Sequence, residues 1–387
     1  MILSKRGETM QIIGIIGEYN PIHLGHIYQI KKAKELYPNS IIILITNTAF
    51  TQRGDINILN KWDKTKISLN NNIDLVIELP FAYATQSADI FAKGAITILN
   101  KLKIDILIFG SESNDLEKII KIVDTQLYNN EYNKKIQKYL DSGLNYPTAA
   151  SNSLKDILGY TTNEPNDLLA ISYIKEIKRN NYKIKPVSIK RTNNYHSIKL
   201  DTNIINATLI RKLYNENNNV SKYIPEKTKK HLYKNLTNES YYPYLKYKII
   251  STNNLTIYQT VEEGIENRLK KNITNSSSWE DLVKNIKTKR YTYNKINRML
   301  IHILTNFTKE EANNINIDYI RVLGFNKKGQ KHLNAIKKGL DIPIITNYKP
   351  NLSKLLDLEL RITSIYELPL NDKLTNKEFK NKPIIKE

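Results

Sequence analysis

The residues best suited to chemistry lie near the start of the chain, where Gly17 to His26 reads GEYNPIHLGH. This segment directly follows an apolar run, Gln11 to Ile16, and precedes a helical pattern. A strand that ends in a turn and feeds a helix gathers backbone N–H groups and the positive end of the helix dipole at one point, where phosphate is favoured. His23 and His26 are three residues apart. A helix that begins near Ile22 therefore puts both on one face, from which each can donate a hydrogen bond to a phosphate oxygen.

Two other interpretations of this segment stay open. The histidines could be packed or surface side chains at a turn, or they could bind zinc together with Glu18. The glycine between them, Gly25, lets a nucleotide approach the backbone closely. A spacing of three residues at a strand-to-helix turn suits phosphate better than a metal, so we predict a phosphate site and no protein-bound metal.

The composition narrows the range of functions. The 387 residues include no cysteine, which excludes disulfides, thiolate zinc sites and an enzyme-bound thioester. The chain has 59 Lys and Arg against 38 Asp and Glu, a formal charge of +21. Such a charge attracts polyanions, and nucleic acid is the natural partner. Compositional drift towards Lys, Asn, Ile and Tyr is the alternative, but drift does not explain why acidic residues fail to balance the basic ones.

The elements that must position the histidines form an alternating pattern. Buried strands are predicted at Gln11 to Ile16, Ser40 to Thr46, Asp74 to Leu79, Ile104 to Phe109 and Tyr182 to Ile189. Helical spacing of apolar residues occurs at Gln29 to Leu36, Ala88 to Leu102 and Ala207 to Tyr214. This order predicts an α/β fold with a Rossmann-like, doubly wound parallel sheet, whose ligands bind outside the carboxyl ends of the strands.

The chain is expected to form two domains, residues 10–215 and 216–387. Beyond about Asn215 the strand runs stop and Lys-, Tyr- and Asn-rich helical patterns follow, with a helix start signal at Ser278 to Asp281. We therefore predict a mostly helical, basic second domain and a loosely held tail from about Asn371. A polar loop is predicted at Arg191 to Asp201.

No apolar run is long enough to span a membrane, and Met1 to Thr9 has no apolar stretch typical of a signal peptide. We expect a cytoplasmic protein without a membrane partner. The sequence leaves its oligomeric state unknown.

The histidine segment resembles the HxGH signature of the nucleotidyltransferase superfamily, and Glu18 to Pro21 in front of it narrows the match. The chain resembles the bacterial tRNA(Met) cytidine acetate ligase family. The family usually has Phe where Ile22 stands and often Asn where Leu24 stands, and both side chains are expected to pack or point away. Supporting segments extend along most of the chain: Gln52-Arg53-Gly54, Lys61-Trp62, Asp74 to Pro80, Ala88 to Ala92, Phe109 to Glu112, Asn166-Asp167-Leu168 and Lys190-Arg191.

The resemblance implies which residues bind ATP. The catalytic pair would be His23 and His26. The ATP site would comprise Ile16, Gly17, Glu18, Tyr19, Asn20, Pro21, Ile22, His23, Leu24, Gly25, His26, Ile27, Tyr28, Gln29, Gly110, Asn166, Arg191, Thr208 and Arg211. Gly110 would lie next to the adenosine, although a plain turn glycine is an alternative. Arg191, Thr208 and Arg211 would meet the phosphates, with Mg²⁺ expected there. A solvated arginine at an ordinary helix start explains the last two nearly as well.

The resemblance also implies a two-step reaction. Acetate would attack the α-phosphorus of ATP to give acetyl-adenylate and pyrophosphate, and the acetyl group would pass to N4 of the wobble cytidine of elongator tRNA(Met). Acetate is its own nucleophile, so no catalytic Ser or Cys is needed, only positioning and positive charge.

Basic and tyrosine residues interleave where RNA could bind. The first cluster comprises Lys229, Lys230, Tyr233, Lys234, Tyr241, Tyr242, Tyr244, Lys246 and Lys248, and the second is Lys287-Thr288-Lys289-Arg290-Tyr291. We expect Lys229, Lys230, Lys287, Lys289 and Arg290 to bind RNA. The alternative is a solvated helix face with its tyrosines in the core.

Two alternative functions stay open. The first is a small-molecule adenylyltransferase of the same superfamily, against which the large basic second domain argues. The second is an RNA-binding protein without turnover that uses the α/β unit as a scaffold.

Overall fold

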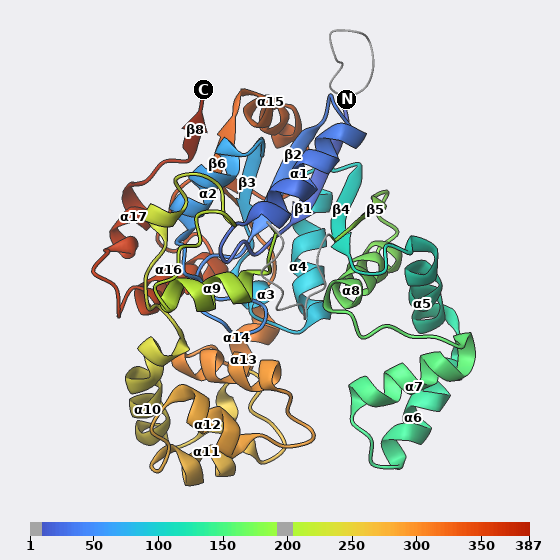
Figure 1. Cartoon of the computed structure of the whole chain (residues 1–387), viewed down its shortest axis with the longest axis vertical. Helices are drawn as coiled ribbons and strands as arrows, with labels where there is room; N and C mark the ends of the chain where they lie inside the picture. The colour runs from blue at the N-terminus through green and yellow to red at the C-terminus, as the bar shows by residue number, and fades with distance from the viewer. Residues whose placement is uncertain (1–9, 192–203) are drawn as a thin grey trace.

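A computed structural model describes residues 10–191 and 204–387, and its centre is an eight-stranded sheet (Figure 1). The five predicted strands are all present and run parallel in the order β5-β4-β1-β2-β3. Their bounds are β1 (Ile12–Ile16), β2 (Ile41–Thr46), β3 (Leu75–Glu78), β4 (Ile106–Ser111) and β5 (Lys185–Lys190). The predicted doubly wound α/β fold is confirmed. The predicted loop 191–201 lies, beyond Arg191, outside the described residues.

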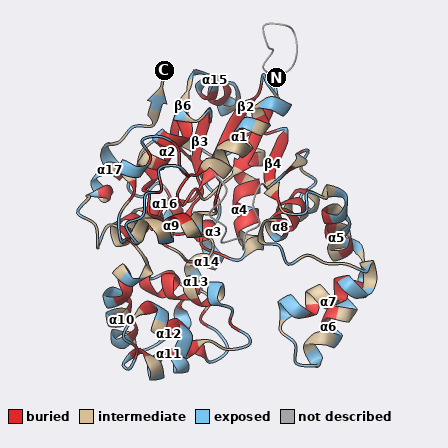
Figure 2. Cartoon of the chain, in the orientation of Figure 1, coloured by how far each residue is buried: buried red, intermediate tan, exposed pale blue. Residues whose placement is uncertain are grey.

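Helices connect and cover these strands. Those of the first half are α1 (Leu24–Leu36), α2 (Lys61–Asn70), α3 (Phe81–Ala84), α4 (Ala88–Lys101), α5 (Leu116–Tyr128), α6 (Asn130–Asp141), α7 (Tyr146–Leu158), α8 (Pro165–Arg179) and α9 (Ala207–Asn215). The central strands are buried on both sides, as Figure 2 shows in red. Close packing needs a glycine in β1: a Cβ on Gly14 would come within 2.8 Å of Leu99 Cδ2 in α4.

The second half begins with helices. Four short 3-10 helices interrupt the order of the longer ones along the chain: η1 (Lys229–His231), η2 (Asn238–Tyr241), η3 (Leu255–Ile257) and η4 (Lys337–Gly339). The longer helices are α10 (Tyr242–Ser251), α11 (Ile265–Ile273), α12 (Trp279–Ile286), α13 (Tyr293–Leu304), α14 (Lys309–Asn314), α15 (Lys327–Ile336), α16 (Lys354–Tyr366) and α17 (Leu374–Lys380). Helices α10 to α13 gather at the end of the molecule opposite the N-terminus (Figure 1).

The last part of the chain departs from the predicted helical domain, because it returns to the sheet. Strand β6 (Ile320–Asn326) pairs antiparallel with β3, and β7 (Ile344–Ile345) and β8 (Ile384–Lys386) pair parallel with β6. The predicted tail from Asn371 is likewise wrong, since it forms α17 and β8. The charged Arg321 interrupts the apolar run of β6, and its burial depends on partners far away in the sequence.

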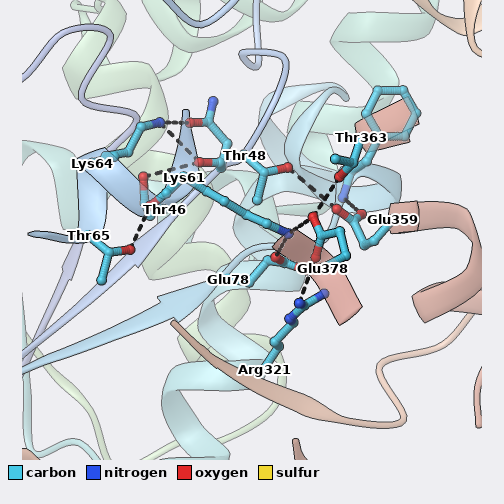
Figure 3. A network of polar contacts seen from close by, with 12 residues as sticks. Thr46, Thr48, Lys61, Lys64, Thr65, Glu78, Arg321, Glu359, Thr363 and Glu378 are labelled. Carbon is cyan, nitrogen blue, oxygen red and sulfur yellow. Dashed lines mark hydrogen bonds and ion pairs between the residues drawn. The ribbon is translucent and has the colours of Figure 1, made fainter. Parts of the chain in front are cut away.

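Those partners form a buried network of charges (Figure 3). Lys61 Nζ lies 2.7 Å from Glu78 Oε2 and 2.6 Å from Glu378 Oε1. Arg321 Nη2 lies 2.6 Å from Glu378 Oε2. Beside them Glu359 accepts hydrogen bonds from the Phe81 N–H and, at 3.4 Å, from the Thr48 hydroxyl. The network joins α2, β3, β6, α16 and α17, and so it holds the C-terminal segment on the sheet.

The five charged side chains of this network comprise three carboxyls and two cations, so a proton on one carboxyl gives a neutral set. Burial, reinforced by Glu78, raises the pKa of Glu359 to about 8. Burial also acts on Glu378, but Lys61 and Arg321 hold the pKa of that carboxyl below its ordinary value. Glu359 is therefore the residue that carries the proton at neutral pH.

Among residues 10–191 and 204–387, none of the helices is long and apolar enough to cross a membrane.

Replacing Glu359 tests this assignment. Between the unfolded pKa, about 4.5, and about 8, the folded protein holds a proton that the unfolded chain has lost, so this group lowers the free energy of unfolding as pH rises. Glu359→Gln keeps both hydrogen-bonding positions without the titration. Relative to wild type, we expect the free energy of unfolding of Glu359→Gln, measured in urea, to rise by on the order of a few kcal/mol from about pH 5.5 to about pH 8.5. The exposed Glu310→Gln is the control, and an equal pH slope in wild type and Glu359→Gln would contradict the assignment.

Candidate functional site

The turn after β1 is held from several sides. The Gly17 N–H donates to the Ile45 carbonyl of β2 at 3.0 Å. The side chain of Asn20 bonds twice to the segment that follows β2: its Nδ2 donates to the Ile56 carbonyl and its Oδ1 accepts from the Ile58 N–H, both at 2.9 Å. These contacts fix the backbone just before the two histidines.

Helix α1 begins at Leu24, two residues later than the sequence suggested, with His23 as its N-cap. His23 Nδ1 accepts from the Gly25 N–H at 3.0 Å, and His26 Nδ1 accepts from the His23 N–H at 3.2 Å. The two rings stack with their centroids 3.8 Å apart. The histidines thus close a reciprocal capping box at the helix start.

This capping fixes the chemistry of both rings. Because each Nδ1 accepts a backbone hydrogen bond, the proton of each neutral ring is on Nε2, which is the atom left to donate to a ligand. Burial, with Arg191 adding to it, lowers the pKa of His23 to about 3. Burial and then His23, Arg191 and Lys64 hold the pKa of His26 well below its ordinary value. The pair is a set of neutral donors at physiological pH.

We predict that neither histidine titrates near neutrality in the unliganded protein. The C–H proton signals of the two rings, assigned by comparison with His23→Gln and His26→Gln variants, should keep constant NMR shifts from about pH 5.5 to pH 8. A titration of either ring with a midpoint near the ordinary value of about 6.5 would contradict this prediction.

Two adjoining cavities of about 450 and 1120 Å³ open beside the histidines at the carboxyl ends of the strands. Most predicted ATP-site residues line them: Ile16, Gly17, Glu18, Tyr19, Asn20, His23, Gly25, His26, Tyr28, Gln29, Gly110, Asn166, Arg191, Thr208 and Arg211. The other four, Pro21, Ile22, Leu24 and Ile27, do not, and Ile22 is fully buried in the core. We call the combined space the nucleotide cleft.

Arg191 and Asn166 are brought together by a residue that the sequence did not single out as part of the site. Glu112, at the end of β4, lies with its Oε1 3.7 Å from Arg191 Nε and accepts a hydrogen bond from the Asn166 side chain. Burial lowers the pKa of Arg191, while Glu112 opposes the shift. Glu112 therefore positions a cation and an amide on one wall of the cleft. Its place directly after an apolar strand was the available signal.

Arg211, predicted to meet the phosphates, lines the cleft and is held there by two contacts. Its Nη1 donates to the Asn20 carbonyl at 2.8 Å, and its Nη2 pairs with Asp55 Oδ2 at 2.9 Å. It therefore ties α9 to the turn before the histidines. The start of α9 still faces the cleft, with Asn206 as its N-cap and Thr208 in its first turn, so backbone N–H groups and the helix dipole point to the ligand side.

Two further cations, which the sequence did not mark as site residues, lie at the cleft or directly behind its lining. Lys64 is fully buried and donates to the carbonyls of Glu18 and Asn47 at 2.6 and 3.0 Å. Burial lowers the pKa of Lys64 to about 7, which Glu18 opposes. Arg53 lines the cleft and acts electrostatically on both Glu18 and Arg191. The cleft is thus lined by Arg53 and Arg191 as well as by Glu18 and Asp55, with Lys64 behind the turn at Glu18.

Gly110 provides a test of the Arg191 position. A Cβ at this residue would lie 3.3 Å from Arg191 Cγ and 3.6 Å from its Cδ, so the arginine must shift. We expect Gly110→Ala to raise KM for ATP by roughly 3- to 30-fold, a partial loss of one charge-assisted contact. Gly339→Ala, where a Cβ meets nothing within 4 Å, is the matched control. An unchanged KM in Gly110→Ala would mean that Arg191 does not contact ATP.

The predicted RNA-binding residues lie outside the cleft. Lys229 and Lys230 are exposed in η1, and Lys289 and Arg290 are exposed between α12 and α13, with Lys287 half-buried beside them. Tyr241 and Tyr242 of the first cluster are in the core, where their hydroxyls donate to the carbonyls of Tyr366 and Ser276, both at 2.6 Å. Those two tyrosines are therefore not stacking surfaces.

Known proteins resemble this chain over nearly its whole length. The model of the HIGH Nucleotidyl Transferase family matches residues 10–382. A tRNA(Met) cytidine acetate ligase of Anoxybacillus flavithermus is 35% identical, with 97% of this chain and 100% of the relative covered. Another, of Oceanobacillus iheyensis, is 38% identical with the same coverage. The chain belongs to the tRNA(Met) cytidine acetate ligase family.

Two solved structures resemble the chain over 97% of its length. The apo structure of Thermotoga maritima TmcAL superposes with a TM-score of 0.89 at 27% identity, covering 97% of this chain and 99% of that one. TmcAL bound with alpha-thio ATP gives a TM-score of 0.86 at 26% identity, with the same coverage. These superpositions cover nearly all of the chain, which includes the C-terminal part where β6 returns to the sheet.

Proposed function

We propose that the protein is an ATP-dependent ligase that joins acetate to N4 of the wobble cytidine of elongator tRNA(Met). The observation that carries the proposal is the pair of Nε2–H donors on His23 and His26, kept neutral by burial and oriented by the start of α1. They face a cleft that also holds Arg53, Arg191 and the start of α9. The names of the relatives and of the TmcAL complex with an ATP analogue support the same conclusion.

In the first step an acetate oxygen forms a bond to the α-phosphorus, and the bond from that phosphorus to the bridging oxygen of pyrophosphate breaks. Charge moves onto the leaving pyrophosphate. The protein supplies neutral and charged donors that are already in place when this charge develops, and no proton has to leave a histidine. The Lys64 contacts and the Arg211 link hold the turn that carries these donors.

Mg²⁺ is expected to accompany the ATP phosphates. In the described part of the chain no group of three or more His, Asp or Glu side chains could hold a metal ion. Asp55 lines the cleft and keeps one carboxylate oxygen outside its pair with Arg211, so it would supply one ligand. The ion would neutralise phosphate charge, and the other contacts of ATP would come from the chain.

In the second step the cytidine N4 attacks the acetyl carbon, the bond from that carbon to the AMP phosphate oxygen breaks, and the amine loses a proton. The base must be held out of a stack for this attack, as it can be in an anticodon loop. We propose that Lys229, Lys230, Lys287, Lys289 and Arg290 bind the RNA backbone. With tRNA as substrate, we expect the enzyme to act in the cytoplasm.

The decisive experiment is ATP–pyrophosphate exchange by the purified protein with Mg²⁺, with and without acetate. We expect exchange that requires acetate. His26→Ala should lower its rate by roughly 10²- to 10³-fold, because one preorganised donor to the phosphates is lost.

The control is His332→Gln, at a buried histidine whose Nε2 lies 2.8 Å from the Leu102 carbonyl, away from the cleft. Exchange absent with every carboxylate tested, even with total tRNA added, would refute the ligase function and favour adenylyl transfer onto a small phosphate ester.

A further inference from the structure

We propose that a groove beside the nucleotide cleft binds the single-stranded RNA next to the reacting cytidine, with one base stacked on Tyr293. This inference rests on the proposed function, because it assigns the binding site of that RNA substrate. It adds a recognition residue that the sequence did not suggest.

The groove is continuous with the cleft. It has a volume of about 1100 Å³, and two of its lining residues, Asp55 and Arg211, also line the cleft. Helices α12 and α13 form one wall of it, where Trp279, Tyr293 and Asn297 line it. An extended strand of RNA can therefore reach from the cleft to Tyr293 without leaving the protein surface.

One helix joins the two sites rigidly. Arg298 of α13 donates from Nη1 to the Gln52 carbonyl at 3.3 Å, in the loop that lines the cleft. In the same loop Gly54 has φ 82°, and a Cβ there would lie 2.5 Å from the Arg298 backbone nitrogen. The loop backbone is thus in direct contact with α13, and Tyr293 at the start of that helix is held in fixed relation to the cleft.

Tyr293 is the groove residue suited to stacking. Its side chain is 56% exposed at the start of α13, and Lys287 Nζ lies 5.5 Å from the centre of its ring. Its neighbour Tyr291 is only 2% exposed, and its hydroxyl donates to the Glu262 carbonyl at 2.7 Å. Aromatic rings stack on bases of any sequence, and nearby cations add phosphate contacts, which Lys289 and Arg290 are exposed to make.

Each acidic residue that lines the groove has a polar partner, and two of the three are paired with a cation. Asp55 pairs with Arg211, and Glu280 pairs with Lys284 at 2.7 Å. Glu239 accepts from the backbone N–H groups of Trp279 and Glu280 at 2.7 and 2.9 Å. Asn297 accepts from Trp279 Nε1 with its amide oxygen at 3.0 Å, which leaves its amide nitrogen as a donor. The groove lining carries three carboxylates and two cations, and the positive charge next to Tyr293 comes from Lys287, Lys289 and Arg290, which lie beside the groove.

The test separates RNA binding from ATP chemistry. Tyr293→Ala should raise KM for elongator tRNA(Met), and the Kd for an anticodon stem-loop, by roughly 5- to 100-fold, the effect of losing one base stack. Tyr293→Phe, which keeps the ring, should restore both values. Acetate-dependent exchange without tRNA should keep the wild-type rate. Tyr247→Ala is the matched control, since Tyr247 is 74% exposed on α10 and outside the groove.

A Tyr293→Ala variant with the same KM and Kd as Tyr247→Ala would overturn the proposal. So would a loss in Tyr293→Phe as large as in Tyr293→Ala, which would point to the hydroxyl instead of the stacking face. Failure of the proposed function is distinguishable, because it would abolish exchange in the wild type while the stem-loop Kd still reports on the groove.

Discussion

The nucleotide cleft depends on the way in which α1 begins. Two imidazole rings accept hydrogen bonds through their Nδ1 atoms from backbone N–H groups at the start of the helix. These hydrogen bonds set the tautomer, the orientation and the stacking of the rings. The two nitrogens point out of opposite sides of the ring, so a ring that is held through Nδ1 has a fixed direction for its Nε2–H relative to the start of the helix. The phosphate donors and the helix dipole are therefore aligned by the same hydrogen bonds, and burial keeps the rings neutral.

The turn before the histidines is held by residues that are remote in sequence, and the buried charges serve the same end. Lys64 and Arg211 donate to carbonyls of that turn, from α2 and α9. One turn of helix before Lys64, Lys61 enters the network that fixes β6 and α17 on the sheet. Buried ion pairs add little net stability, but breaking one leaves an uncompensated charge, so the network specifies a single arrangement of these elements.

Local patterns in the sequence predicted the parallel sheet and most of the cleft. Strands such as Ile41–Thr46 are apolar throughout because both faces are covered, and the histidine turn lies between such a strand and a helix. The position of β6 was not predictable in this way. Its Arg321 looks like a surface residue until its partner Glu378 is known, and the two are brought together only by folding. The start of α1 was misplaced because a histidine is an unusual N-cap.

Residues that act by holding other side chains or the backbone in place escaped prediction for the same reason. Glu112 and Lys64 matter through the groups they hold. Sequence spacing gives no distance between Glu112 and Arg191, which directly follow the neighbouring strands β4 and β5. By contrast, Gly110 was predictable because it ends a strand at the ligand side of the sheet. A site residue can be predicted from the sequence when its role follows from its position on a strand or helix. It cannot be predicted in this way when its role depends on a partner that only folding brings close.

The loop 51–54 shows how one element serves two binding sites. On one side its Gln52 N–H donates to Glu18 Oε1 at 2.6 Å, and Arg53 lines the cleft. On the other side it contacts α13 so closely that only a glycine fits at residue 54. An acyl transfer between two large substrates requires the amine and the acyl carbon to meet within about 3.5 Å. A short, doubly anchored loop between the ATP side and the RNA side meets that requirement better than a flexible linker, because it leaves no rotation between the two sites to be ordered in each turnover.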